Sequence, residues 1–283
     1  MINLSVVVPA TDRPTTLGSC RAAIEASTDP PDELIVVDGP PSLSAAEARN
    51  AGVARATGDV VVFVDADVEV HPDALGRIRA AFEADPGLTA LHGSYDDRPR
   101  ARTTVSAFRN LLHHHVHHHP GRRPVETFWT GLGAVRRSAF EAVGGFDGQR
   151  YPHPSIEDIE LGHRLVTAGG RLRLDPAVQG THLKRWTLRS MVHTDFARRA
   201  VPWIALQVRT RRLASTLNCG WPHRLSAAAC TVAPLALALG LPAAAMAAVV
   251  AFVGLNRSFH GLLVRRLGPA RAVAGVALHA LHH

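Results

Sequence analysis

Two carboxylates that could do chemistry follow a Val-rich run at residues 59–64. Asp65 and Asp67, separated by Ala66, come where a strand formed by that run would end. Ligand sites in open α/β sheets form at the carboxyl edge of the strands, so both side chains are expected there. Carboxylates two residues apart can approach one hard cation, and Mg²⁺ or Mn²⁺ bridging diphosphate oxygens would neutralise the charge that builds on a departing nucleoside diphosphate. The alternative is that both acids only end the strand or cap the next helix.

A second group of acids occurs within residues 155–161. Ser155 is expected to cap a helix that carries Glu157, Asp158 and Glu160 in its first turns. A carboxylate held near an acceptor hydroxyl can remove its proton as a general base. The alternative is that these acids only stabilise the start of the helix.

Three short apolar runs predict the strands that would position these acids. Residues 4–8, 33–37 and 59–64 are Val-rich, as in parallel strands buried on both faces. Residues 16–27 and 44–56 are patterned and long enough for crossover helices. The alternation of strands and helices predicts one half of an open α/β sheet. Further elements are predicted downstream, namely a helix at 72–84, a strand at 88–94, a strand at 127–136, and a short helix at 138–143 that Gly144 and Gly145 close.

Seven segments follow one another along the chain: residues 6–13 (VVVPATDR), 36–39 (VVDG), 48–52 (ARNAG), 58–67 (GDVVVFVDAD), 131–137 (GLGAVRR), 144–147 (GGFD) and 157–158 (ED). In this order, over residues 3–184, they resemble family 2 glycosyltransferases. The resemblance implies the GT-A fold, an α/β class with a Rossmann-like open mixed sheet. It places a catalytic domain at residues 1–187.

The resemblance also implies roles for individual residues. Asp67 would be the metal ligand, and Asp65 would contact the nucleotide or the water shell of the metal. Asp38 would bind the base, and Asp158 would be the general base. His182 would be a further contact to the metal or the diphosphate, although a lone His after a strand is more often structural.

The remaining positions are expected on the donor and acceptor sides of this site. Thr11 stands where family members often carry an aromatic residue, and Gly39 where they often carry a second acid, so base stacking and ribose contacts are expected to differ. The aromatic residues near the acceptor could equally fill the core. Donor contacts are expected from Pro9, Thr11, Arg49 and Asn50, and acceptor or diphosphate contacts from Trp129, Gly131, Glu157, Arg199 and Trp203.

The reaction that the resemblance implies is an inverting, metal-dependent transfer of a sugar from a nucleotide donor, a UDP- or GDP-sugar. Asp158 would remove the proton of the acceptor hydroxyl, whose oxygen attacks the anomeric carbon while the metal stabilises the leaving diphosphate. The acceptor is expected to be lipid-linked or a cell-envelope glycan.

The C-terminal third predicts contact with a membrane. Residues 188–213 form a basic, aromatic-bearing helical pattern that suits a membrane interface, and a linker to residue 223 follows. Residues 225–255 carry no charge, which predicts a membrane-embedded segment within a hydrophobic region at 224–283. Gly240 and Pro242 could divide it into two half-length legs, or it could cross once as one long helix. Without a secretory leader, the catalytic domain is expected in the cytoplasm.

Composition leaves two rival classes open. Lys and Arg number 31 against 24 Asp and Glu, which gives a formal charge of +7 and favours an anionic partner. A nucleic-acid-binding protein would share this charge, but the uncharged run argues against it. A noncatalytic scaffold with the same fold is the other rival. The three cysteines are widely spaced and are expected as reduced thiols.

The polar stretch at residues 96–124 has few core candidates. Six histidines lie between His113 and His119, and imidazoles are good ligands for transition metals. We expect instead a solvated loop over the acceptor site.

Overall fold

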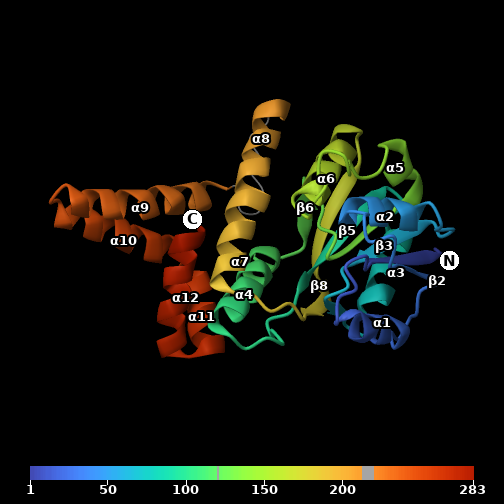
Figure 1. The fold of residues 1–283 in the computed structure, drawn as a ribbon, viewed down its shortest axis with the longest axis horizontal. Coiled ribbons are helices and arrows are strands. Elements are labelled where there is room, and N and C mark those ends of the chain that lie inside the picture. The colour runs from blue at the N-terminus through green and yellow to red at the C-terminus, as the bar shows by residue number, and fades with distance from the viewer. Residues whose placement is uncertain (120, 212–219) are drawn as a thin grey trace.

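One mixed β-sheet forms the centre of the N-terminal part of the protein (Figure 1). The computed structural model describes residues 1–119, 121–211 and 220–283. The strands are β1 (Leu4–Pro9), β2 (Glu33–Val37), β3 (Val60–Val64), β4 (Val68–Val70), β5 (Leu88–Tyr95), β6 (Arg123–Val125), β7 (Leu132–Arg136) and β8 (Arg171–His182). Within the described residues their order is β2-β1-β3-β7-β5-β8-β4, and β6 pairs with β8.

The parallel half of the sheet has the strands and helices that the sequence predicts. β1 lies between β2 and β3 and is parallel to both. The crossover helices are α1 (Leu17–Glu25) and α2 (Ala45–Val53). A capping box starts α2, in which the Ser44 hydroxyl accepts the N–H of Glu47 and the Glu47 carboxylate accepts the N–H of Ser44.

Helices cover both faces of the sheet, because successive strand residues point to opposite sides. On one face, Val62 and Val64 of β3 pack with α1 and α3 (Ala74–Ala84). On the other face, Phe63 packs with α2, α5 (Arg137–Ala142) and α6 (Glu157–Thr167). All of β3 is therefore buried, as expected for a central strand that carries a site at its end.

An antiparallel strand enters the sheet beside β3. β7 pairs with β3 on one side and β5 on the other, with Gly133 opposite Phe63. The predicted strand at 127–136 is wrong in its first half, because β7 begins at Leu132. Residues 127–131 form a loop instead, and the Gly131 carbonyl accepts the N–H of Asp65 at 3.2 Å. This loop brings its side chains to the end of β3.

Residues 96–124 contain a helix that the sequence analysis missed. α4 (Thr104–His118) begins after Thr103, whose hydroxyl accepts the N–H of Ser106 at 3.2 Å. Phe108, Leu111 and Leu112 are buried in a core shared with the C-terminal helices. The prediction of a solvated loop is therefore wrong, because apolar residues at helical spacing decide the structure despite the polar residues between them.

A long helical segment follows the sheet, as predicted for residues 188–213. α7 (Leu188–His193) continues through the π-helical segment η1 (Thr194–Ala200) into α8 (Val201–Thr210). Phe196, Ile204 and Val208 are exposed along it. Residues 212 and 213 of the predicted helix lie outside the described residues, as does Cys219.

The uncharged residues 225–255 belong to two helices rather than one. α9 (Trp221–Ala238) and α10 (Pro242–Leu255) lie side by side as a hairpin that projects from the rest (Figure 1). Gly240, with a φ of 71°, lies in the turn between them. The prediction of two legs is therefore confirmed, and that of one uninterrupted helix is wrong.

The last two helices return to the body of the protein. α11 (Arg257–Leu267) and α12 (Pro269–His282) both pack against α4. Among the described residues, no single helix has the length and apolarity to cross a bilayer, although α10 and α11 meet both requirements when taken together across a bend of 72°.

Candidate functional site

Asp65 and Asp67 lie at the carboxyl edge of the sheet, as predicted. Asp65 directly follows β3, and its carbonyl accepts the N–H of Val68 at 2.9 Å in the tight turn to β4. The two side chains have different neighbours, because Asp65 contacts Arg49 whereas Asp67 contacts His182. Asp65 and Asp67 therefore make two separate contacts on this edge, one with Arg49 and one with His182, and do not form one paired site.

β8 brings His182 to Asp67. Val68 pairs with His182 in the antiparallel β4–β8 ladder, which leaves His182 Nε2 3.5 Å from Asp67 Oδ2. The His182 ring stacks on Tyr95 at a centroid distance of 4.2 Å. Burial by itself raises the pKa of Asp67, but the contact with His182 outweighs it and holds the pKa of this carboxyl below its usual value.

One carboxylate beside one imidazole suits the protein's share of a divalent-metal site. Within residues 1–119, 121–211 and 220–283, no group of three or more His, Cys, Asp or Glu residues is arranged to hold a metal alone. A cation bound by Asp67 and His182 would take its other ligands from a diphosphate or water, as Mg²⁺ commonly does with nucleotides. The donor set therefore fits a metal that binds together with a nucleotide.

Arg49 joins the end of β3 to the start of α6. Its Nη2 lies 2.8 Å from Asp65 Oδ1, and its Nη1 lies 3.0 Å from Glu157 Oε1. Only 4% of Arg49 is exposed. Burial opposes the charge, but the two carboxylates outweigh it and raise the pKa of the guanidinium, which is therefore always charged. Arg49 thus fixes the spacing between the two acidic motifs.

Asp158 lies next to this bridge in the first turn of α6. Its Oδ2 accepts the N–H of Thr130 at 3.3 Å, and its Oδ1 accepts the N–H of Ile159 at 2.8 Å. Burial, reinforced by the negative charge of Glu157, raises the pKa of Asp158 to about 7. A carboxyl that titrates near neutral pH is well matched to general-base work.

The predicted cap of α6 is wrong. α6 starts after Ile156, and no side chain caps it. The Ser155 hydroxyl instead donates to the Arg198 carbonyl at 2.6 Å. This bond is available because η1 runs beside the start of α6, and it links the segment that carries Arg199 to the Asp158 helix.

The predicted donor residues lie near the ends of β1 and β2 and on α2. Pro9 is the last residue of β1, and Asp38 is exposed immediately after β2. The Thr11 hydroxyl donates to the Leu43 carbonyl at 3.1 Å. The Asn50 amide makes two hydrogen bonds of 2.9 Å with the backbone of Phe146, so this side chain holds the GGFD loop in place.

The predicted acceptor residues divide into a packed group and an exposed group. Trp129 contacts the Tyr95 ring edge-on at a centroid distance of 4.9 Å, and a Cβ at Gly131 would collide with the Trp129 ring. Arg199 is exposed on η1. Trp203 packs against the cluster of Tyr151, Ile156 and Leu206 next to α6.

Two histidines of α4, His113 and His117, belong to a buried ring cluster behind the site. His113 lies between Tyr95 and His117, with centroid distances of 4.3 Å and 3.9 Å. Burial lowers the pKa of both His113 and His117 well below the usual value, so both rings are neutral. Sequence reasoning missed Tyr95, which joins this cluster to His182; its place at the end of a predicted strand was the available signal.

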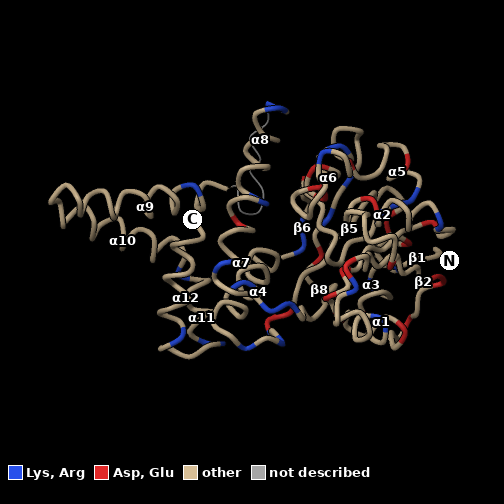
Figure 2. The backbone as a smooth tube through the Cα atoms, in the orientation of Figure 1, with Lys and Arg blue, Asp and Glu red and all other residues tan. Residues whose placement is uncertain are grey.

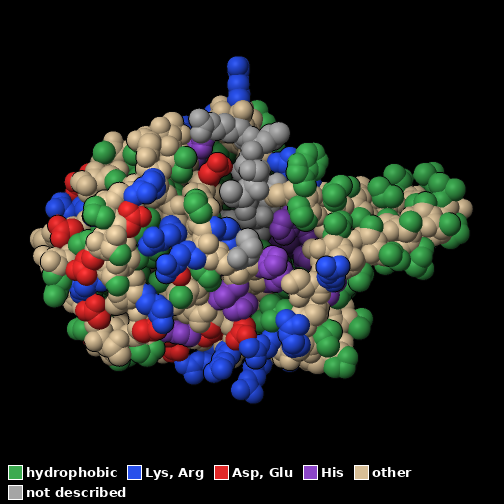
Figure 3. Space-filling view, turned by 180° about the vertical axis from the view of Figure 1, so that it is seen from behind, with side chains coloured by type: hydrophobic (Ala, Val, Ile, Leu, Met, Phe, Trp, Pro, Cys, Tyr) green, Lys and Arg blue, Asp and Glu red, His purple; other side chains and the backbone are tan. Residues whose placement is uncertain are grey.

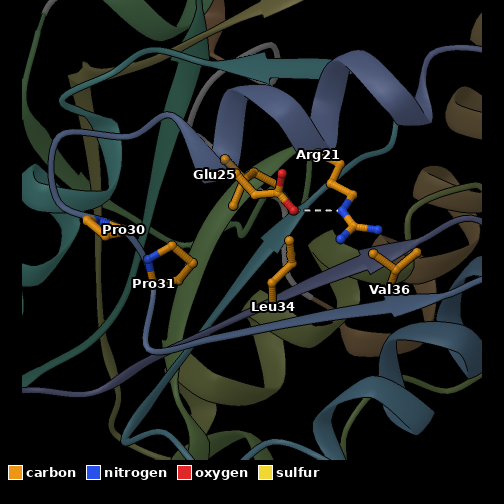
Figure 4. A pocket seen from close by; sticks show the side chains of 7 residues that line it. Arg21, Glu25, Pro30, Pro31, Leu34 and Val36 are labelled. Carbon is orange, nitrogen blue, oxygen red and sulfur yellow. Dashed lines mark hydrogen bonds and ion pairs between the residues drawn. The ribbon is translucent and has the colours of Figure 1, made fainter.

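Two surface grooves lie near these elements. One of about 340 Å³ separates α8 from the loop before α6, and its basic lining includes Arg150, Arg198 and Arg209. The other, of about 420 Å³, lies between α1 and β2, where Arg21 and Glu25 form an ion pair at 2.7 Å (Figure 4). The second groove has none of the predicted site residues in its lining, whereas the first adjoins Ser155 and the start of α6.

A solved structure shares the architecture described above. The mannosyltransferase PcManGT from Pyrobaculum calidifontis, in complex with GDP-Man and Mn²⁺, superposes with a TM-score of 0.63 over 99% of this chain and 87% of its own, at 20% identity. The likeness confirms the GT-A fold predicted from the sequence. The chain therefore has the GT-A fold.

Sequence comparison matches part of the chain to glycosyltransferases. Residues 42–144 match the family model described as "Glycosyl transferase family 2". The pre-mycofactocin glycosyltransferases of two Mycobacterium tuberculosis strains, CDC 1551 / Oshkosh and ATCC 25618 / H37Rv, are each 30% identical over 166 residues, which is 56% of this chain. The match spans about a third, 34%, of the length of these relatives. Residues 42–144 are therefore similar to glycosyltransferase family 2, in agreement with the resemblance of the sequence motifs.

Proposed function

We propose that this protein transfers a sugar from a nucleoside-diphosphate donor to a hydroxyl acceptor with inversion at the anomeric carbon. One observation carries the proposal: the sheet edge places the Asp67–His182 pair, the Arg49-bridged acids and Asp158 at the same end of β3. The arrangement separates a place for a metal-bound diphosphate from a carboxylate suited to deprotonate an acceptor.

The donor side is assigned to Asp38, Asp65 and Asp67. A divalent cation held by Asp67 and His182 would supply positive charge to the leaving diphosphate. Mn²⁺ suits a mixed carboxylate and imidazole pair better than Mg²⁺, which prefers oxygen ligands. The neighbour from Pyrobaculum calidifontis carries GDP-Man and Mn²⁺, which supports a nucleotide sugar and this metal as the first ligands to test.

Asp158 is the proposed general base. Its Oδ2 accepts the Thr130 N–H, which fixes the carboxyl at the loop that precedes β7. In the proposed step the acceptor hydroxyl gives its proton to Asp158 as its oxygen bonds to the anomeric carbon, and the bond from that carbon to the diphosphate oxygen breaks. The electron pair leaves with the diphosphate, so no covalent sugar–enzyme intermediate forms.

The acceptor is proposed to bind in the basic groove between α8 and the loop before α6. Arg150, Arg198 and Arg209 would favour an anionic group, such as a phosphate that links the growing sugar to a lipid. The exposed apolar residues of α8 and of the α9–α10 hairpin support an acceptor at a membrane surface, with the catalytic domain on its cytoplasmic side.

Calorimetric titration in detergent tests the donor site. We expect one member of a panel of UDP- and GDP-sugars to bind only with Mn²⁺ present, and Asp67→Ala to weaken that binding at least tenfold. Glu141→Gln, which removes an exposed acid from α5, is the control that should leave binding unchanged. A folded protein that binds no nucleotide would favour a noncatalytic scaffold.

A further inference from the structure

The α9–α10 hairpin exposes large apolar side chains around its circumference. Residues 225–255 contain no charged side chain, and Figure 2 shows the hairpin without charge beyond the start of α9. From behind, it projects as a green and tan rod away from the charged body (Figure 3). The exposed large residues are Leu225, Val232, Leu235, Leu237, Leu239, Leu241, Met246, Val249, Val250, Val253 and Leu255.

The hairpin buries small side chains and exposes large apolar ones, whereas a pair of helices in water buries its large apolar side chains. Its buried positions include the small residues Ser226, Ala236, Ala245 and Ala248, whereas nearly all its large apolar residues point outward. Small residues let two helices approach closely where burial of large side chains gives no driving force, as in lipid. A hydrogen bond of 2.8 Å from Asn256 Nδ2 to Ser226 Oγ closes the base. This pattern indicates hydrocarbon around the hairpin.

The turn at the tip satisfies its own backbone amides. The Gly240 N–H donates to Leu237 at 3.1 Å, and the Leu241 N–H donates to Ala236 at 2.8 Å, which together form a Schellman motif at the positive φ of Gly240. Pro242 then starts α10 without an N–H to satisfy. A bilayer interior tolerates a turn only where its polar groups find such partners.

The legs are too short for a crossing. α10 has 14 residues, and the uncharged part of α9, residues 225–238, is equally long, which corresponds to about 21 Å at 1.5 Å per residue, against about 30 Å of hydrocarbon. The tip consists of Leu239, Gly240 and Leu241, none of which would anchor at a far headgroup layer. The charges lie instead at the base, with Arg224 before one leg and Arg257 after the other.

We propose that the α9–α10 hairpin is a re-entrant membrane anchor that enters one leaflet, turns at Gly240 and leaves on the side it entered. The inference rests on the membrane association proposed above. Basic residues at the base of both legs would meet anionic headgroups on that side. The catalytic domain, α8 and both ends of the hairpin then face the same compartment.

Two other arrangements fit the structure less well. A broken crossing by α10 and α11 would require α11 to leave the body, but Phe259 and Leu263 of α11 are buried against α4. A second copy of this chain would cover one side of the hairpin and leave exposed apolar residues on the others. A bilayer covers every face at once.

Single cysteines report the path of the hairpin. In a background with Cys219→Ser and Cys230→Ala, which keeps only the fully buried Cys20, we would place Leu239→Cys at the tip, Ser258→Cys at the base and Ala22→Cys on α1. The proteins are reconstituted in vesicles of neutral and anionic phospholipid and treated with a membrane-impermeant maleimide outside, or inside after encapsulation. We expect the base and α1 cysteines to react from one shared side, and the tip cysteine to react only after detergent is added.

Labelling of the tip from the side opposite α1 would overturn the proposal in favour of a crossing. Labelling from the same side as α1 would overturn it in favour of a hairpin in water. Val250→Asp should reduce flotation with the vesicles at least tenfold, whereas Ala22→Asp should not; equal flotation of the two variants would also overturn the anchor. Donor binding measured in each preparation shows separately whether the proposed enzymatic function fails.

Discussion

At the scale of single residues, the environment of Asp158 predicts the pH dependence of the reaction. Burial and Glu157 raise the pKa of this carboxyl to about 7, and only its ionised form can accept a proton. Turnover should therefore fall as pH drops below about 7. Asp158→Asn should lower kcat by about 10²-fold or more while donor affinity changes little, because the substitution removes the proton acceptor but not the diphosphate contacts. Initial rates between pH 5.5 and pH 9 and donor titrations measure both effects.

Glu160→Gln is the matched control on the same helix. Glu160 pairs with Arg164 at 2.8 Å and is buried, so its loss should reduce stability without moving the pH profile. A profile of the native protein that is flat between pH 5.5 and pH 8, or full activity of Asp158→Asn, would disprove the assignment of the base.

Local sequence predicts which residues lie at the site better than it predicts what they contact. Asp65 and Asp67 were predicted correctly at the sheet edge, because a buried strand followed by polar residues determines where its end lies. Arg49 was expected at the donor, yet it binds Glu157, which is 108 residues away in sequence. No periodicity encodes such a contact, since it depends on how α2 and α6 pack on the same face.

At the scale of elements, the contact of β5 with α4 predicts acid sensitivity. His92 on β5 is 1% exposed, and burial lowers its pKa to about 4, compared with about 6.5 in an unfolded chain. As pH falls below 6.5 the unfolded state binds the proton first, so stability is lost between about pH 6.5 and pH 4. This one side chain should account for about 2 kcal/mol of the loss between pH 7 and pH 5. Denaturant unfolding at both pH values measures it.

His92→Leu keeps an apolar group of comparable size and cannot titrate, so the difference in stability between the two pH values should shrink. His153→Gln, at an exposed position, serves as the control and should leave that difference unchanged. If His92→Leu loses as much stability on acidification as the native protein, the buried neutral imidazole is not the cause.

The parallel strands and α4 show which elements could be predicted from the sequence and which could not. The parallel strands were predicted within a residue or two, because Val-rich runs have one stable solution in a sheet covered on both faces. α4 was missed because its apolar residues Phe108, Leu111 and Leu112 are followed by histidines that pattern analysis treats as polar. One of these, His113, packs against Tyr95 and Trp129, which approach from distant parts of the chain.

At the scale of the whole molecule, Asp195 links three helical parts of the chain: η1, α4 and α12. It lies on η1, pairs with Arg109 of α4 at 3.0 Å and accepts a contact from His282 of α12 at 2.9 Å. The Arg109 side chain is only 7% exposed, and burial lowers its pKa to about 10 while Asp195 opposes that shift. α4, the π-helical segment that carries Arg199, and α12 therefore meet at one carboxylate.

Asp195→Ala should destabilise the protein by about 3 to 5 kcal/mol, because it leaves the Arg109 guanidinium buried without its carboxylate. Glu141→Gln, which removes an exposed ion pair with Arg137, is the control and should cost less than about 1 kcal/mol. Thermal unfolding in detergent compares the two. The double variant Asp195→Leu with Arg109→Met removes both charges and should recover part of the loss, since apolar side chains can replace a buried pair. Equal unfolding temperatures for Asp195→Ala and Glu141→Gln would show that Asp195 does not hold these parts together.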